Sequence, residues 1–158
     1  MKKLLRLLEK DAHLTAEELA LMCEKEVGDI KKMIDAYEEE GIILGYTTVI
    51  DWDKTDTEYV NALIELKVIP ERLHGYDGIA EKIYNYPEVE SLYLMSGGFD
   101  LAVMLRGKTM REIAAFVASK LAVLDSVTAT ATHFVLQKYK ENGVIFGAPQ
   151  KDERGNCL

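Results

Sequence analysis

The chain of 158 residues is poor in cysteine and in long apolar runs, and each shortage excludes a class of protein. Its two cysteines, Cys23 and Cys157, lie far apart and match no metal-binding or redox spacing, so a disulfide framework is excluded and a reducing compartment is favoured. No apolar run approaches the roughly 20 residues of a membrane-spanning helix. Charges at positions 9–11 interrupt the apolar start too early for a secretory signal. We therefore expect a cytoplasmic protein with no membrane partner.

Basic charge is also in short supply. The sequence has 19 Lys and Arg against 27 Asp and Glu, a net charge of -8 and a pI of about 4.9. A protein that coats nucleic acid non-specifically would be basic, so this class is excluded, although a locally basic surface is not. There is no phosphate-binding or dinucleotide-binding loop, no nucleophile–base pair and no histidine pair with metal-ligand spacing. The sequence predicts no cofactor, no metal site and no enzymatic activity.

What the sequence does contain, over residues 1–50, is the pattern of three short helices. Thr15 and Glu18 form a capping box at the start of the second helix, because each side chain can accept from the other's backbone N–H. The third helix is predicted over residues 25–40, and Gly41 ends it. Residues 42–50 are β-rich. The inward side chains of the third helix recur at helical spacing: Val27, Ile30, Ile34 and Tyr37. This order predicts a winged helix-turn-helix.

The rest of the chain alternates strands with helices. Residues 51–58 are polar and are predicted to form a linker. Strands are expected at 60–68, 89–95, 99–106 and 128–139, and helices at 75–85 and 110–124. This order, βαββαβ over residues 59–142, predicts a ferredoxin-like sheet with both helices on one face, within an α+β chain. Residues 143–158 show no periodicity and are predicted to be a weakly ordered tail that contains Cys157 as an exposed thiol.

The predicted strands carry apolar side chains on both faces, although two helices can cover only one. Leu63 faces opposite to Ile64, and Tyr93 and Met95 face opposite to Leu92. An uncovered apolar face requires a partner. We expect a homodimer through this face; the alternative is packing against the N-terminal domain.

Several stretches together resemble the Lrp/AsnC family, the leucine-responsive or feast/famine regulators. The glutamate-rich run into Gly-Ile-Ile and the Gly-x-aromatic-Asp hairpin are the most specific. The resemblance covers the chain to about residue 140 and implies a winged helix-turn-helix that binds double-stranded DNA, a RAM domain that binds a small effector, and dimers that assemble into tetramers or octamers. The matching stretches are Leu14-Thr15-x-x-Glu18-Leu19-Ala20, Tyr37-Glu38-Glu39-Glu40-Gly41-Ile42-Ile43-x-Gly45-Tyr46-Thr47, Tyr86-Pro87-Glu88-Val89, Gly97-x-Phe99-Asp100 and Thr130-x-Thr132.

For DNA binding, the resemblance implies that the third helix enters the major groove. Residues 1–50 hold seven Lys and Arg against eleven Asp and Glu, a net charge of -4. On one alternative, Lys31 and Lys32 belong to a solvated helix face and pair with Asp35 and Asp29. On another, the helix-turn-helix has lost DNA binding and the protein is an oligomeric effector sensor. The predicted DNA-binding residues are Lys25, Gly28, Asp29, Lys31 and Lys32.

For effector binding, the resemblance implies a site at the hairpin between the second and third strands. Gly97 and Gly98 let backbone amides approach a carboxylate, because no side chain shields them. Asp100 can accept from an α-ammonium group, and Thr130 and Thr132 present hydroxyls on one face. The predicted ligand is an amino acid or a related metabolite. The alternatives are a tight turn for the glycines and a turn-capping role for Asp100. The predicted effector-binding residues are Gly97, Gly98, Phe99, Asp100, Thr130 and Thr132.

An enzymatic alternative shares this two-domain layout. Siroheme decarboxylases resemble the same family but bind a tetrapyrrole, for which we expect a Trp-, Pro- and Tyr-rich insertion with basic or histidine residues around the pocket. The equivalent hairpin here is short, and the single tryptophan, Trp52, lies in the predicted linker. The sequence favours the regulator over the enzyme.

Overall fold

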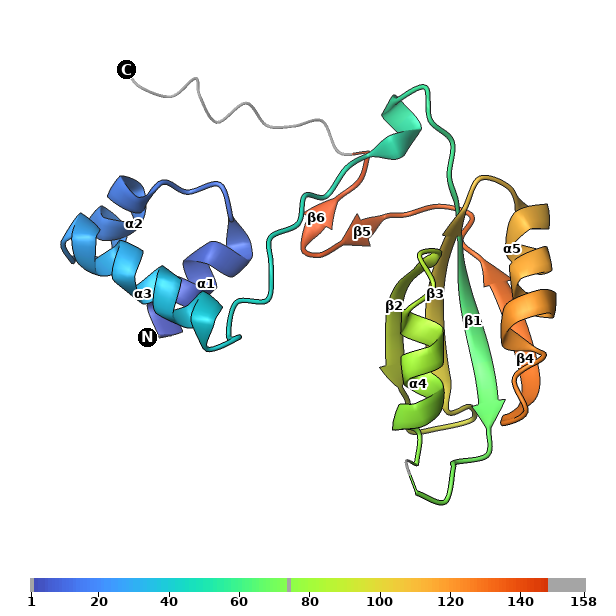
Figure 1. Cartoon of the computed structure of the whole chain (residues 1–158). Coiled ribbons are helices and arrows are strands. Elements are labelled where there is room, and N and C mark those ends of the chain that lie inside the picture. The colour runs from blue at the N-terminus through green and yellow to red at the C-terminus, as the bar shows by residue number, and fades with distance from the viewer. Residues whose placement is uncertain (1, 74, 148–158) are drawn as a thin grey trace. The chain divides into compact units, whose positions relative to one another are not determined.

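The computed structural model of the chain describes residues 2–73 and 75–147, in two compact units (Figure 1). One unit consists of the described residues of Met1–Ile50 and Lys140–Leu158, and the other is Asp51–Tyr139. Among the described residues, no helix has the length and apolar character needed to span a bilayer.

The first unit contains the three predicted helices, α1 (Lys2–Lys10), α2 (Ala16–Cys23) and α3 (Val27–Glu39). They share a small core in which Leu19 and Ile30 are fully buried. Val27 and Ile34 are partly buried against this core and Tyr37 is buried in it, so the predicted inward face of α3 is confirmed. The capping box is also confirmed: the Thr15 N–H donates to Glu18 Oε2 at 2.8 Å, and the Glu18 N–H donates to Thr15 Oγ1 at 3.2 Å.

The turn between α2 and α3 depends on one residue in a left-handed conformation. Glu24 has φ 54° and ψ 49°, a conformation that glycine usually supplies at the end of a helix. The chain then enters α3 at Glu26, whose side chain makes no capping hydrogen bond. Both glutamates therefore stand where smaller residues would stabilise the turn better.

The β structure predicted at residues 42–50 is not formed in the described chain. The Ile42 and Ile43 N–H groups both donate to the Tyr37 carbonyl, at 2.8 and 3.0 Å, and no strand follows. A strand needs a neighbour for its backbone groups, and none of the described residues supplies one. The helix-turn-helix is thus present without a wing.

The second unit has the predicted βαββαβ order. The elements are β1 (Val60–Val68), α4 (Asp77–Tyr84), β2 (Val89–Leu94), β3 (Leu101–Gly107), α5 (Met110–Phe116) and β4 (Val127–Phe134). The strands pair antiparallel in the order β2-β3-β1-β4, and both helices lie on one face of the sheet (Figure 1). The core between sheet and helices contains Ile64, Leu66, Val103, Ile79 and Leu121, all buried. The predicted ferredoxin-like architecture is confirmed.

Two predicted elements end earlier than expected. The helix predicted over residues 110–124 passes at Val117 into a π-helix, η2 (Val117–Leu121), in which the Ala122 N–H donates to the Val117 carbonyl at 2.8 Å. The last strand stops at Phe134 instead of continuing to residue 139; one more bond follows, from the Val135 N–H to the Asn61 carbonyl at 2.9 Å, and β1, which begins at Val60, has no residues to pair with the rest of the predicted strand.

The segment after Tyr139 forms a short hairpin of β5 (Lys140–Glu141) and β6 (Val144–Ile145). The start of the predicted weakly ordered tail, residues 143–147, therefore includes regular structure. Residues 148–158, with the predicted exposed thiol of Cys157, lie outside the described residues.

Candidate functional site

The exposed face of α3 carries the predicted DNA-binding residues. Lys31 and Lys32 are exposed on the helix, whereas Ile30 between Asp29 and Lys31 is fully buried. Neither lysine makes an ion pair with any described residue, so the pairing of Lys31 with Asp35 and of Lys32 with Asp29 is not found. Their ammonium groups are available to an external anion. All five predicted residues are exposed: Lys25, Gly28, Asp29, Lys31 and Lys32.

The end of α3 is tied to the segment that follows it. The Tyr46 hydroxyl donates to Glu38 Oε1 at 2.7 Å. This hydrogen bond to a carboxylate favours the protonated phenol and so raises the pKa of Tyr46. The bond fixes residues 42–46 against the helix end, and a cavity of about 590 Å³ lies between this segment and α1, with Lys2 and Arg6 among its lining residues. Sequence reasoning missed this cavity, because only the fold brings α1 beside residues 42–47.

The predicted effector hairpin joins β2 to β3. The Met95 N–H donates to the Asp100 carbonyl at 2.8 Å and closes a loop of residues 96–99. Gly97 has a positive φ of 153°, and Gly98 is not in a positive-φ conformation. A Cβ added at either glycine would meet no atom within 4 Å. The space in which a Cβ would stand is therefore open at both glycines.

Asp100 anchors the hairpin to the neighbouring strand. Its Oδ2 accepts from the Val68 N–H at 2.8 Å, its Oδ1 accepts from the Tyr76 hydroxyl at 3.4 Å, and its own N–H donates to the Leu66 carbonyl at 2.9 Å. An ionised carboxylate offers about four lone-pair positions, so two bonds leave room for an ammonium group. These contacts give Asp100 a structural role. They also leave lone pairs on its carboxylate for the predicted contact with a ligand.

The two predicted threonines lie across β1 from Asp100. Thr130 and Thr132 pair with Leu66 and Ile64, whose side chains are buried beneath the helices, so both threonines face the helix side of the sheet. They stay exposed because β4 is an edge strand. Asp100 flanks Leu66 on the opposite edge of β1, which puts it two strand spacings, roughly 9–10 Å, from Thr130. Within one chain, the predicted effector residues are divided by β1.

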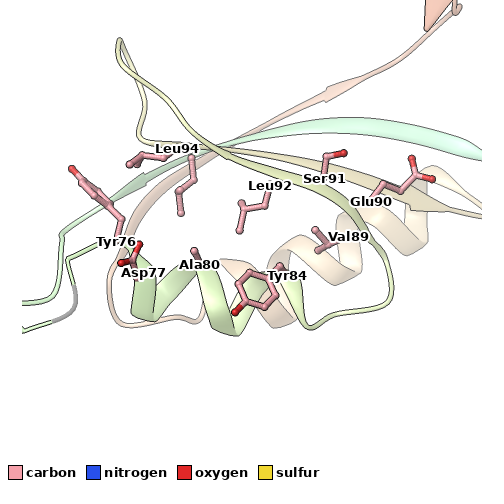
Figure 2. A pocket seen from close by; sticks show the side chains of 10 residues that line it. Tyr76, Asp77, Ala80, Tyr84, Val89, Glu90, Ser91, Leu92 and Leu94 are labelled. Carbon is pink, nitrogen blue, oxygen red and sulfur yellow. The ribbon is translucent and has the colours of Figure 1, made fainter. Parts of the chain in front are cut away.

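The second unit also has a groove, and none of the six predicted effector-binding residues lines it. It has a volume of about 320 Å³ and runs between α4 and the edge strand β2 (Figure 2). Asp77 and Tyr84 line it from the helix, and Leu92 and Leu94 line it from the strand. Leu94 remains 61% exposed, because the eight-residue helix leaves this end of the strand uncovered. Sequence reasoning missed this groove; the signal was the apolar alternation of Leu92 and Leu94 on an edge strand.

The sheet face opposite the helices is uncovered, as predicted. Tyr93 is 55% exposed and Met95 43% exposed, while Ala102 is buried between its neighbours. On the same face, His133 Nε2 lies 3.3 Å from Glu65 Oε1. The sequence correctly predicted an apolar sheet face that the two helices do not cover.

Comparisons with known proteins agree with this architecture. The model of the Lrp/AsnC ligand binding domain matches residues 61–145. The HTH-type transcriptional regulator YugG of Bacillus subtilis is 44% identical over 96% of this chain and 92% of its own length. The HTH-type transcriptional regulator LrpA of Pyrococcus abyssi is 30% identical over 88% of this chain and 96% of its own. A Neisseria meningitidis transcriptional regulator, solved in complex with L-Met, superimposes with a TM-score of 0.70 at 20% identity over 94% of each chain.

A three-helix DNA-binding unit joined to an antiparallel ligand-binding unit of this order defines a ligand-responsive transcriptional regulator. The chain belongs to the Lrp/AsnC family, and the family resemblance of the sequence is confirmed.

Proposed function

We propose that this regulator acts in the cytoplasm, senses an amino acid or a related zwitterion at the hairpin of residues 95–100, and reads double-stranded DNA through α3. The observation that carries the effector class is the open backbone of Gly97 and Gly98 beside the carboxylate of Asp100. Donors and an acceptor so placed suit a ligand with both a carboxylate and an ammonium group. The L-Met complex of the Neisseria meningitidis regulator supports the same class.

A homodimer through the uncovered sheet face is part of this proposal. Leu63 and Met104 are cross-strand partners in the middle of that face, with Tyr93 and Ala131 on the flanking strands. Burying such a patch against a second copy removes apolar surface from water. Tetramers or octamers would bring further copies to the hairpin end.

Two observations support DNA contact through Lys31 and Lys32: both are exposed, and neither forms an ion pair with a described residue. Each lysine that meets a phosphate releases counterions, so each lost contact lowers the slope of log affinity against log salt by about one unit. Because the first unit is net acidic, binding should be weak away from the specific site.

The experiment is a DNA selection followed by a salt titration, with and without a panel of amino acids. The double variant Lys31→Ala, Lys32→Ala should lose affinity and reduce the salt slope by about two units. The matched control is Lys108→Ala, Arg111→Ala, which removes the same charge from exposed positions in the other unit. Equal affinity of parent and α3 variant would remove α3 as the reader. No DNA binding at any salt would favour an effector sensor with a degenerate helix-turn-helix.

A further inference from the structure

The start of the linker is fastened to the second unit by a stack of side chains. The Trp52 ring lies edge-on to the Tyr59 ring, with centroids 5.1 Å apart and planes at 85°. The Arg106 guanidinium lies over the Tyr59 ring, with Cζ 5.0 Å from the ring centroid. Arg106 Nη2 is 2.6 Å from Glu90 Oε1. The stack thus links the linker to β3 and β2, although the sequence indicated only a polar connection.

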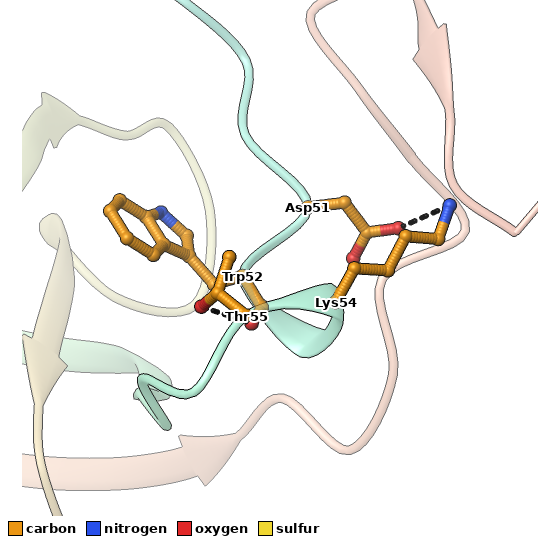
Figure 3. Close-up of polar contacts among 4 residues, drawn as sticks. All are labelled: Asp51, Trp52, Lys54 and Thr55. Carbon is orange, nitrogen blue, oxygen red and sulfur yellow. Dashed lines mark hydrogen bonds and ion pairs between the residues drawn. The ribbon is translucent and has the colours of Figure 1, made fainter.

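The chain between the two aromatic residues is held in a compact turn. Trp52 begins a short 3-10 helix, η1 (Trp52–Lys54), and Lys54 Nζ lies 3.1 Å from Asp51 Oδ2 (Figure 3). The Thr55 hydroxyl donates to the Trp52 carbonyl at 2.8 Å and accepts from the Thr57 N–H at 3.1 Å. These bonds are local, so the turn can leave the sheet as one piece.

The closed stack carries an opposing cost. Arg106 Nε and Asn61 Oδ1 are both buried, and neither has a hydrogen-bond partner among the described residues. Arg106 and Asn61 are cross-strand neighbours, so the donor and the acceptor lie at the same end of the sheet. The two ring contacts and the ion pair with Glu90 favour the closed stack, and the unpaired donor and acceptor offset part of that gain. The closed form therefore predominates, and its margin is small enough for the loss of one ring to change the open population.

The chain just before the stack is unrestrained. Among the described residues, the backbone groups of residues 47–50 have no hydrogen-bond partner. The chain passes between the two units twice, after Ile50 and after Tyr139. With the stack closed, residues 47–50 are the free part of the first connection. With the stack open, residues 52–59 join the free segment, and each adds up to roughly 3.3 Å of reach.

We propose that the Trp52–Tyr59–Arg106 stack is a latch that sets the length of free chain in the first of the two connections between the DNA-binding and ligand-binding units. Its closed state shortens the tether, and its open state lengthens it and lets water reach Arg106 Nε and Asn61 Oδ1. The proposal requires neither a particular effector nor the proposed DNA contacts, so it can be tested without ligand or DNA.

Two readouts follow the latch in the full-length protein. Trp52 is the only tryptophan, so acrylamide quenching of its fluorescence reports the exposure of this ring alone. Trypsin cleavage after Lys54, followed by mass spectrometry, reports opening of the turn, because cleavage tracks the population of the open form. Tyr59→Leu removes both ring contacts, whereas Tyr59→Phe keeps them and is the matched control.

Tyr59→Leu should be cleaved after Lys54 about tenfold faster than the parent and should be quenched more strongly. Tyr59→Phe should match the parent in both measurements. Trp52→Leu, which alters no residue of the sheet, should also accelerate cleavage and covers the case in which Tyr59→Leu loses its fold. Equal cleavage rates for parent, Tyr59→Leu and Trp52→Leu would overturn the latch, as would quenching of the parent equal to that of N-acetyltryptophanamide.

Discussion

The carboxylate of Asp100 gives the sharpest test of how the effector hairpin is held. Its bond from the buried Val68 N–H is 2.8 Å long, and its bond from the Tyr76 hydroxyl is longer, at 3.4 Å. A hydrogen bond to a charged group contributes roughly 1.5–3 kcal/mol, and a neutral one about 0.5–1.5 kcal/mol. Asp100→Asn keeps an oxygen acceptor for Val68 and should lower the free energy of unfolding by about 1 kcal/mol.

Asp100→Ala removes the acceptor and leaves the Val68 N–H unpaired, so the expected loss is about 2–3 kcal/mol. For a unit of this size, each kcal/mol corresponds to a fall of roughly 4–8 °C in the melting temperature. Urea unfolding, followed by circular dichroism, measures both variants. The control is Asp125→Asn, since Asp125 is exposed and forms no hydrogen bond or ion pair with a described residue.

Ligand titration separates the anchor from the proposed ligand contact. If Asp100 also pairs with an α-ammonium group, Asp100→Asn should weaken binding of an amino-acid ligand by about one to two decades, beyond its effect on stability. Stability equal to the parent in Asp100→Ala would refute the anchor derived from the geometry. Lower stability in Asp100→Asn with unchanged ligand affinity would leave the anchor and remove Asp100 from the effector site.

Other positions test the dimer, the helix turn and the cap. Ala131→Glu puts a charge into the proposed dimer face and should raise the dimer dissociation constant about a hundredfold in analytical ultracentrifugation; an unchanged constant would place the interface elsewhere. Glu24→Gly removes the side chain that disfavours the left-handed conformation, and it should raise the free energy of unfolding, measured in urea, by about 1 kcal/mol. A lower free energy of unfolding would show that Glu24 is not strained. The backbone hydrogen bond from Thr15, and then its hydroxyl, lower the pKa of Glu18 below 4.5, so its stabilisation is present above pH 4.5 and lost as the pH falls through the lowered value. Glu18→Gln should flatten the stability profile in that acid range; an unchanged profile would refute the cap.

Local patterns accounted for most of the fold. The alternation of Ala62, Ile64 and Leu66 predicted the central strand correctly, because burial on one face of a sheet repeats every second residue. The capping box of Thr15 and Glu18 predicted the start of α2, because both bonds lie within one helical turn.

Features that depend on distant partners could not be read from the same patterns. Residues 42–50 have strand-forming side chains, but strand formation requires a partner that composition does not reveal. The stack on Trp52 joins residues that are separated by more than fifty positions in the chain, and only the sheet register brings Arg106 beside Tyr59. The bond from Val68 to Asp100 likewise spans 32 positions.

The separation of Asp100 from Thr130 has a consequence for the proposed effector site. The ammonium nitrogen and the carboxylate oxygens of one α-amino acid lie within about 4 Å of each other, so with a hydrogen bond of about 2.9 Å at each end the ligand spans roughly 9–10 Å. This span is close to the two strand spacings between Asp100 and Thr130, so a ligand held by both residues of one chain would have to lie extended across β1. A site shared between the hairpin of one copy and the last strand of another is free of this limit. Ligand affinity would then depend on protein concentration, because binding and assembly would stabilise each other.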